Sequence, residues 1–164
     1  MRQALAPLVL LLLASCPSRP ATIVVPRAPD LETAAVARGL VRDPRDRDPT
    51  GLYARDTDRL CIVPQGGGFR VGAVVDYGDG LSCNGAGRAS RSGGALRIDL
   101  GPNCAFDARF DGDRIDFPAR LPEGCAALCA RTASFAALGV DRLSESISEA
   151  AAMRDAKGAL PCAS

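Results

Sequence analysis

From residue 51 onwards, hydrophobic and polar residues alternate in short runs that glycine and aspartate separate. Such alternation is typical of antiparallel strands with one buried and one solvated face. The clearest run is 69–77, in which every second residue from Phe69 to Tyr77 is apolar or aromatic and falls on one face. The pattern predicts strands over 51–56, 60–64, 69–77, 83–91, 95–101, 104–110, 113–117 and 133–142.

The connections between these runs are short, which favours strands that pair in sequence order. Gly93-Gly94 and Asp111-Gly112 are two-residue hairpin signals because these residues tolerate positive φ. The fold class we expect is therefore mainly β, a small antiparallel meander barrel or curled sheet of about eight strands. With only five Phe and two Tyr to fill a core, its interior should be narrow and leave little room for a large ligand.

Two helices are expected outside the strands. Residues 141–155 are helical in pattern, and Ser146 with Glu149 forms a capping box. A second, short helix is expected from Leu31 to about Val41, where Asp30 can cap its start.

The first residues read as an export signal. Arg2 precedes an apolar stretch over 4–13, and the small residues Ala14 and Ser15 follow. This stretch is too short to cross a bilayer as a helix, which takes about 20 apolar residues. The run Leu13-Ala14-Ser15-Cys16 resembles the lipobox of bacterial lipoproteins.

The lipobox resemblance implies cleavage before Cys16, a diacylglycerol on its sulfur and an acylated amino terminus. Two or three acyl chains hold a protein on a bilayer, whereas one binds only marginally. The chain then divides into a signal peptide (1–15), a lipidated Cys with a Pro-rich tether (16–50) and a β domain with a C-terminal helix (51–164). Asp after the lipidated Cys favours inner-membrane retention in enterobacteria; here Pro17 favours the outer membrane, facing the periplasm.

Composition narrows the chemistry. The 164 residues carry 20 basic and 19 acidic side chains, so no net field attracts nucleic acid. There is no His and a single Lys, Lys157, so most standard catalytic bases and metal ligands are missing. We therefore expect no catalytic residues, no metal and no cofactor.

Other chemistry has an ordinary structural explanation. Four aspartates (Asp107, Asp111, Asp113 and Asp116) could suggest calcium or a carboxylate pair, but turn formation around Gly112 explains them without a metal. Four serines lack an activating base; they are Ser82, Ser90, Ser92 and Ser134. Five arginines alternate with apolar residues and are expected on the solvated face; they are Arg88, Arg91, Arg97, Arg109 and Arg114.

Six cysteines besides Cys16 form an even set, which in an exported chain predicts disulfides. Counting outwards from a turn at Gly93-Gly94 places Cys83 directly opposite Cys104, in a non-hydrogen-bonded pair. The Cα separation of such a pair, about 4.5 Å, lies in the disulfide range. We therefore predict a Cys83–Cys104 bond. The pairing of the other four stays open; they are Cys61, Cys125, Cys129 and Cys162.

The architecture loosely resembles small β-barrel envelope lipoproteins that inhibit lysozymes or proteases, although no shared motif supports this. The first hypothesis is a non-enzymatic envelope lipoprotein that binds the membrane through its anchor and an envelope protein or the cell wall as partner. The second is an inhibitor of a lytic enzyme or protease, with the loops at 66–68 and 78–80 as the candidate contacts. The third is a glycan hydrolase using carboxylates alone.

Overall fold

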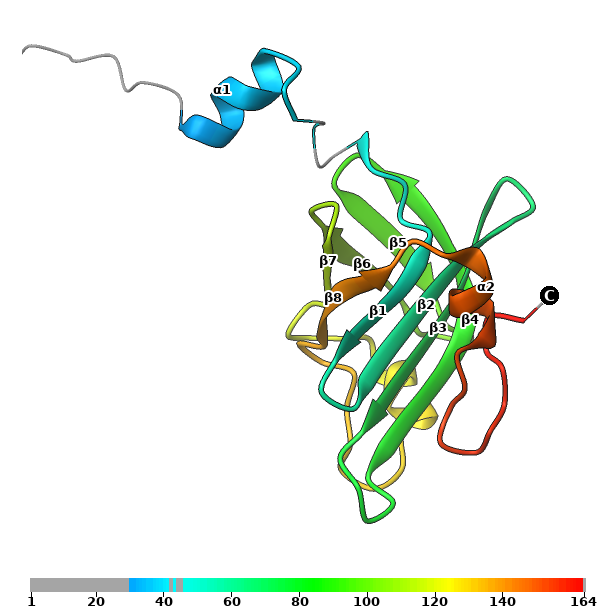
Figure 1. The fold of residues 1–164 in the computed structure, drawn as a ribbon. Coiled ribbons are helices and arrows are strands. Elements are labelled where there is room, and N and C mark those ends of the chain that lie inside the picture. The colour runs from blue at the N-terminus through cyan, green and yellow to red at the C-terminus, as the bar shows by residue number, and fades with distance from the viewer. Residues whose placement is uncertain (1–29, 42, 44–45, 164) are drawn as a thin grey trace, which may run out of the picture.

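The computed structural model describes residues 30–41, 43 and 46–163 (Figure 1). The expected signal peptide, the lipobox and Cys16 therefore lie outside the described residues. Within the described part of the chain, no helix is both long and apolar enough to cross a membrane.

Eight antiparallel strands form one closed barrel, in which each strand pairs with its neighbours in sequence and β1 pairs with β8. The strands are β1 (Gly51–Arg55), β2 (Asp58–Gln65), β3 (Gly68–Asp76), β4 (Ser82–Ser92), β5 (Ala95–Asp99), β6 (Ala105–Phe110), β7 (Arg114–Asp116) and β8 (Gly139–Ser144). The expected meander barrel is thus confirmed.

The barrel interior is filled by the apolar half of each alternating strand. On β5 and β6, Leu96, Ile98, Phe106, Ala108 and Phe110 are buried, and the residues between them are exposed or half-buried. Tyr53, Leu60 and other buried side chains of the remaining strands complete one continuous core. An eight-stranded barrel is just wide enough for its own side chains to fill it, as here.

A second, smaller core lies outside the barrel. On β2, Cys61 and Val63 point outwards but are buried, because helix α2 (Ile147–Ala152) and the C-terminal tail cover them. The Cys61–Cys162 disulfide ties that tail to β2. A Cβ at Gly72 would lie 2.6 Å from Cβ of Pro161, so only glycine lets the tail approach β3 this closely.

Both expected helix caps are confirmed, but both helices are shorter than predicted. The Asp30 carboxylate accepts from Thr33 N at 2.8 Å at the start of α1 (Leu31–Ala37), and Ser146 Oγ accepts from Glu149 N at 3.3 Å at the start of α2. Helix α2 ends at Ala152 because Met153 adopts an extended conformation (φ −57°, ψ 132°) and is buried in the second core.

The predicted strand 133–142 starts six residues too early. Residues 133–138 are irregular, with a turn at Ala136–Ala137 in which Ala137 has φ 58°, and β8 begins at Gly139. Phe135 and Leu138 are nevertheless buried, since this segment folds over one end of the barrel. Tyr77, expected on the buried face of β3, is 59% exposed because the strand ends at Asp76.

The barrel end at which the chain enters β1 is closed around Arg142. Its guanidinium is almost fully buried and donates to the backbone oxygens of Asp48 (2.8 Å), Thr50 (2.7 Å) and Gly112 (2.8 Å). It also lies over the Tyr53 ring, 5.0 Å from the centroid. Burial raises the pKa of Tyr53, while the positive charge of Arg142 opposes that rise. Arg142 thus fastens the segment before β1 and the β6–β7 turn to the barrel.

Replacing Arg142 should be costly. Arg142→Gln removes the donor from three backbone oxygens, so we expect a loss of about 3 kcal/mol in the free energy of unfolding. Urea unfolding measures this change. Arg109→Gln is the matched control, because Arg109 is exposed and its 3.7 Å pair with Asp111 should contribute less than about 1 kcal/mol. Equal effects of the two substitutions would contradict this role of Arg142.

Candidate functional site

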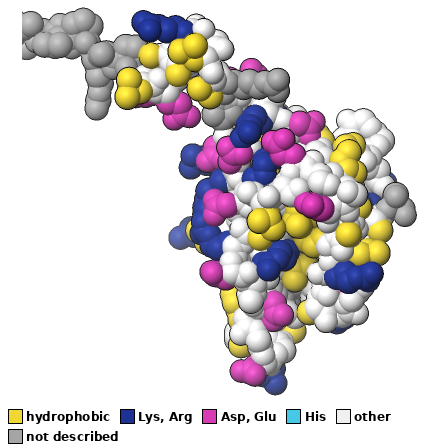
Figure 2. Space-filling view, in the orientation of Figure 1, with side chains coloured by type: hydrophobic (Ala, Val, Ile, Leu, Met, Phe, Trp, Pro, Cys, Tyr) yellow, Lys and Arg dark blue, Asp and Glu magenta, His cyan; other side chains and the backbone are white. Residues whose placement is uncertain are grey.

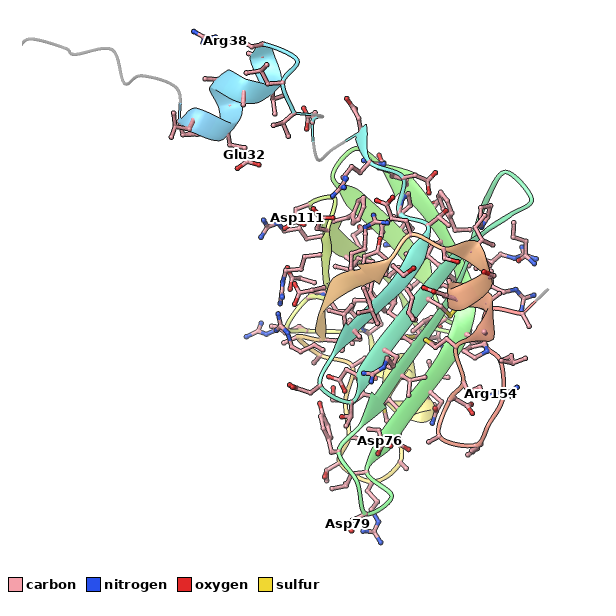
Figure 3. All side chains as sticks on the ribbon, viewed as in Figure 1. Glu32, Arg38, Asp76, Asp79, Asp111 and Arg154 are labelled. Atoms are coloured by element: carbon pink, nitrogen blue, oxygen red, sulfur yellow. A yellow bond between two sulfur atoms is a disulfide. The ribbon has the colours of Figure 1, made fainter. Side chains whose placement is uncertain are left out.

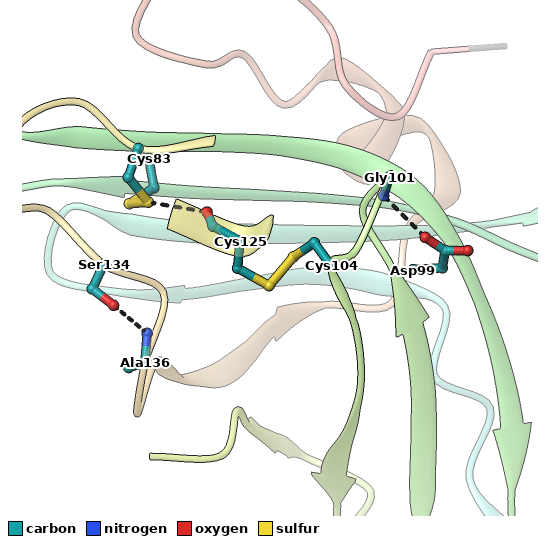
Figure 4. Close-up of a disulfide and its surroundings, with 8 residues drawn as sticks. Cys83, Asp99, Gly101, Cys104, Cys125, Ser134 and Ala136 are labelled. Carbon is teal, nitrogen blue, oxygen red and sulfur yellow. Dashed lines mark hydrogen bonds between the residues drawn. A yellow bond between two sulfur atoms is a disulfide. The ribbon is translucent and has the colours of Figure 1, made fainter. Parts of the chain in front are cut away.

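The opposite end of the barrel is closed covalently. The 3-10 helix η2 (Glu123–Leu128) lies across it, and two disulfides, Cys83–Cys129 and Cys104–Cys125, fix it to β4 and to the residue before β6 (Figure 4). Beneath the segment, the Phe106 and Phe117 rings pack edge to face with centroids 4.7 Å apart, and Phe135 lies next to Phe117 at 6.3 Å. With both ends closed and the interior filled, a partner can reach only the outer surface and the loops.

The predicted Cys83–Cys104 disulfide is wrong. The hairpin count itself holds, from Ser92 opposite Ala95 to Arg88 opposite Asp99. However, β5 stops at Asp99, and the chain reverses through a turn in which the Asp99 carboxylate accepts from Gly101 N at 2.9 Å. Cys104 therefore lies just before β6 instead of opposite Cys83. Cys83 is bonded to Cys129 and Cys104 to Cys125. The two remaining cysteines, Cys61 and Cys162, are bonded to each other.

The candidate catalytic side chains do not converge. The four aspartates 107, 111, 113 and 116 are engaged by arginines or turn amides, and basic and acidic side chains are interspersed over this side of the barrel (Figure 2). Their partners are Arg97 for Asp107 (3.4 Å), the Arg114 amide for Asp111 (2.9 Å), Arg47 and Arg142 for Asp113, and Arg114 Nε for Asp116 (2.7 Å). Ser134 Oγ accepts from Ala136 N at 3.0 Å in a turn.

No metal site is evident in the part of the chain that the structure describes: no three Cys, Asp or Glu residues there are grouped to hold an ion. Lys157 is exposed in a turn, where its amide donates to the Asp155 carboxylate at 2.9 Å. Ser90 and Ser92 are exposed on β4, and the Ser82 carbonyl accepts from Ala130 N at 2.8 Å. Nothing in these contacts assembles a nucleophile with a base.

The most distinctive surface feature is the β3–β4 loop, which we call the Tyr77 loop (residues 76–81). It projects from the end of the barrel that η2 closes, and Figure 3 shows Asp79 at its tip. Tyr77 is the most exposed of the seven aromatic side chains of the chain. Exposed tyrosines on protruding loops are common anchors of protein interfaces. The loop is therefore a candidate protein-binding site.

Internal hydrogen bonds give the Tyr77 loop one conformation. Tyr77 N donates to Leu81 O (2.9 Å), Leu81 N donates to Gly78 O (2.8 Å), and the Asp76 carboxylate accepts from Gly78 N (2.9 Å). Gly78, Asp79 and Gly80 all have positive φ, between 51° and 79°. Most residues other than glycine are strained at positive φ, and aspartate is one of the few that tolerate this conformation.

Contacts at its base hold the Tyr77 loop to the rest of the molecule. Cys83, two residues after the loop, is bonded to Cys129, and Ala130 N donates to Ser82 O at 2.8 Å. Arg131 reaches the loop itself and lies 3.5 Å from Asp79 O. A loop fixed in this way loses little conformational entropy when it binds, which favours affinity.

Sequence reasoning singled out the glycines of this loop but misassigned its tyrosine. Strict alternation predicts Tyr77 on the buried face of β3. However, the glycines and aspartates between Asp76 and Gly80 are turn residues and indicate that the strand has ended. Arg142 was not singled out at all, because one arginine at the end of a strand gives no sequence signal of burial. The glycine turn at 66–68 connects β2 and β3 and is exposed at the barrel end where β1 begins.

Comparison with protein-family models, with curated proteins and with solved structures finds no significant match for this chain.

The cysteine pairing can be checked directly. Proteolysis of the unreduced protein, followed by mass spectrometry, should give three linked peptide pairs, Cys61 with Cys162, Cys83 with Cys129 and Cys104 with Cys125. Alkylation before digestion prevents thiol exchange, and a reduced sample is the control. A peptide linking Cys83 to Cys104 would show that η2 does not close the barrel as described.

Proposed function

We propose that this protein is a lipid-anchored lipoprotein of the cell envelope, non-enzymatic, that binds an envelope protein through the Tyr77 loop. The observation that carries the proposal is the filled barrel with both ends closed, which leaves an ordered, protruding loop as the best-defined contact surface. Scattered, arginine-paired carboxylates favour binding over hydrolysis by carboxylates alone.

The position of the loop agrees with an N-terminal anchor. The chain enters the barrel at Gly51, and successive strands alternate in direction, so the β3–β4 loop lies at the end away from that entry. A barrel attached to a membrane at its N-terminal side therefore presents Tyr77 away from the attachment point. Three disulfides, all outside the lipobox, favour an oxidising, extracytoplasmic location. Pro17 after Cys16 favours the outer membrane.

Acylation tests the anchor. Expressed in a Gram-negative host, the full-length chain should incorporate labelled palmitate and fractionate with membranes. The Cys16→Ala variant should do neither, because it lacks the sulfur on which the lipid thioether forms. Metabolic labelling and membrane flotation measure this. The matched control is Cys61→Ser with Cys162→Ser, which removes a disulfide but leaves the lipobox intact. Membrane association of the Cys16→Ala variant would refute the anchor.

Crosslinking tests the binding surface. A photoreactive residue at position 77 should crosslink to a defined envelope protein in intact cells, because Tyr77 lies at the projecting end of the barrel. The same residue at position 143 is the control, since Leu143 is similarly exposed (66%) but lies on β8. Equal crosslinking at the two positions, or none at position 77, would contradict the proposed contact.

The second candidate is an inhibitor of a lytic enzyme or protease. A rigid projecting loop on a disulfide-bonded barrel favours it, because such a loop can enter the substrate cleft of an enzyme at low entropic cost. In that case Tyr77→Ala should weaken inhibition of a susceptible lysozyme or protease by tenfold or more, about the effect of losing one interface anchor. Leu143→Ala is the control. Absence of inhibition by the wild-type protein across both enzyme classes rejects this candidate.

A further inference from the structure

We infer that a second site, on the outer face of β3 and β4, binds a phosphate group through Arg70 and Arg88. These residues are direct cross-strand partners, so two guanidinium groups project from the same face of neighbouring strands. They line a groove of about 500 Å³, together with the β2–β3 hairpin and the small residues Ala86 and Gly87. This groove, here called the Arg70–Arg88 groove, is separate from the Tyr77 loop.

The arginine pair is unfavourable for folding. Like charges directly opposite one another on antiparallel strands repel and destabilise the sheet. Among the described residues, neither Arg70 nor Arg88 forms an ion pair, whereas Arg47, Arg55 and Arg97 each have a carboxylate partner. Two neighbouring arginines without an ion-pair partner therefore suggest a ligand that supplies negative charge.

The neighbouring side chains orient the pair without neutralising it. With its amide oxygen turned towards Arg70, Gln65 accepts from both Nη2 and Nε at 3.3 Å, which fixes the guanidinium but adds no charge. Asp99 is the cross-strand partner of Arg88 on β5, yet its carboxylate accepts from Gly101 N at 2.9 Å instead of pairing with Arg88. The positive charge of the groove thus stays available.

The surroundings leave room for a ligand beside the two arginines. Gly66 and Gly67 form the hairpin turn with φ of 56° and 79°, and a Cβ at either position would meet nothing within 4 Å. The small residues Ala86, Gly87 and Ala89 of β4 and the half-buried Phe69 also line the groove. A phosphate group carries three acceptor oxygens and nearly two negative charges, so it can accept from two guanidinium groups at once.

The test uses the full-length Cys16→Ala chain, so that the lipid anchor does not contribute to binding. Inorganic phosphate is titrated against the isotope-labelled protein while amide shifts are followed by NMR. Separately, the chain is sedimented with vesicles of phosphatidylcholine alone or mixed with phosphatidylglycerol. The variants are Arg70→Gln and Arg88→Gln, and Arg97→Gln is the matched control, an exposed arginine of β5 paired with Asp107 at 3.4 Å.

We expect saturable binding that each groove variant weakens by about tenfold, the effect of losing one charge-assisted hydrogen bond, while Arg97→Gln leaves it unchanged. Shifts at residues 66–70 and 86–89 with inorganic phosphate identify a soluble phosphate compound as the source. Sedimentation with the vesicles that contain phosphatidylglycerol, without shifts on addition of inorganic phosphate, identifies a lipid headgroup as the source. Neither groove variant should lower Tm, because each relieves repulsion. Absence of binding in both arms, binding retained in both groove variants, or a lower Tm without weaker binding overturns the inference.

Discussion

The filled interior of the eight-stranded barrel determines where this protein can bind a partner. A barrel of eight strands either fills with its own side chains or holds one small ligand. Here buried side chains such as Tyr53, Leu60 and Phe110 fill the interior, so it does not serve as a ligand cavity. Binding has to take place on the loops and the outer face of the barrel. These surfaces bind more favourably when the rest of the structure holds them in one conformation.

Different interactions fix the two ends of the barrel. At the end where the chain enters, the buried Arg142 gathers backbone oxygens from two segments far apart in sequence. At the other end, disulfides through Cys83 and Cys104 hold η2 over the buried phenylalanine rings. Because covalent bonds fix the base of the Tyr77 loop, its conformation does not depend on a partner. The loop is thus preorganised at the end away from the N-terminal attachment.

Much of the barrel follows from the sequence, because alternation and glycine turns are local signals. They predicted the strand order, the Gly93-Gly94 hairpin and both helix caps at Asp30 and Ser146. The errors arise where tertiary contacts override the local pattern. The strand containing Ala95 ends at Asp99 because a turn follows it, so Cys104 does not lie opposite Cys83. The alternation of apolar and polar residues does not reveal this turn.

The candidate surfaces were less accessible to sequence reasoning. Tyr77 was assigned to the core, since the alternation of β3 continues through it although the strand does not. Arg88 was expected on the solvated face, where it lies, but its partnership with Arg70 depends on the register between β3 and β4. Register across a hairpin depends on the length of its loop, and the five residues between these strands gave no simple two-residue turn to count from.

Hydroxyl-radical footprinting of Tyr77 shows whether a partner covers the loop in the cell envelope. The ring is exposed in the isolated protein and should react rapidly there, whereas in intact envelopes a bound partner should slow its oxidation. Leu143 on β8 and Ile147 on α2, both exposed, should react alike in both samples. We expect slower oxidation in envelopes at Tyr77 alone. Equal reactivity of Tyr77 in envelopes and in isolation would contradict the assignment of the loop as the binding surface.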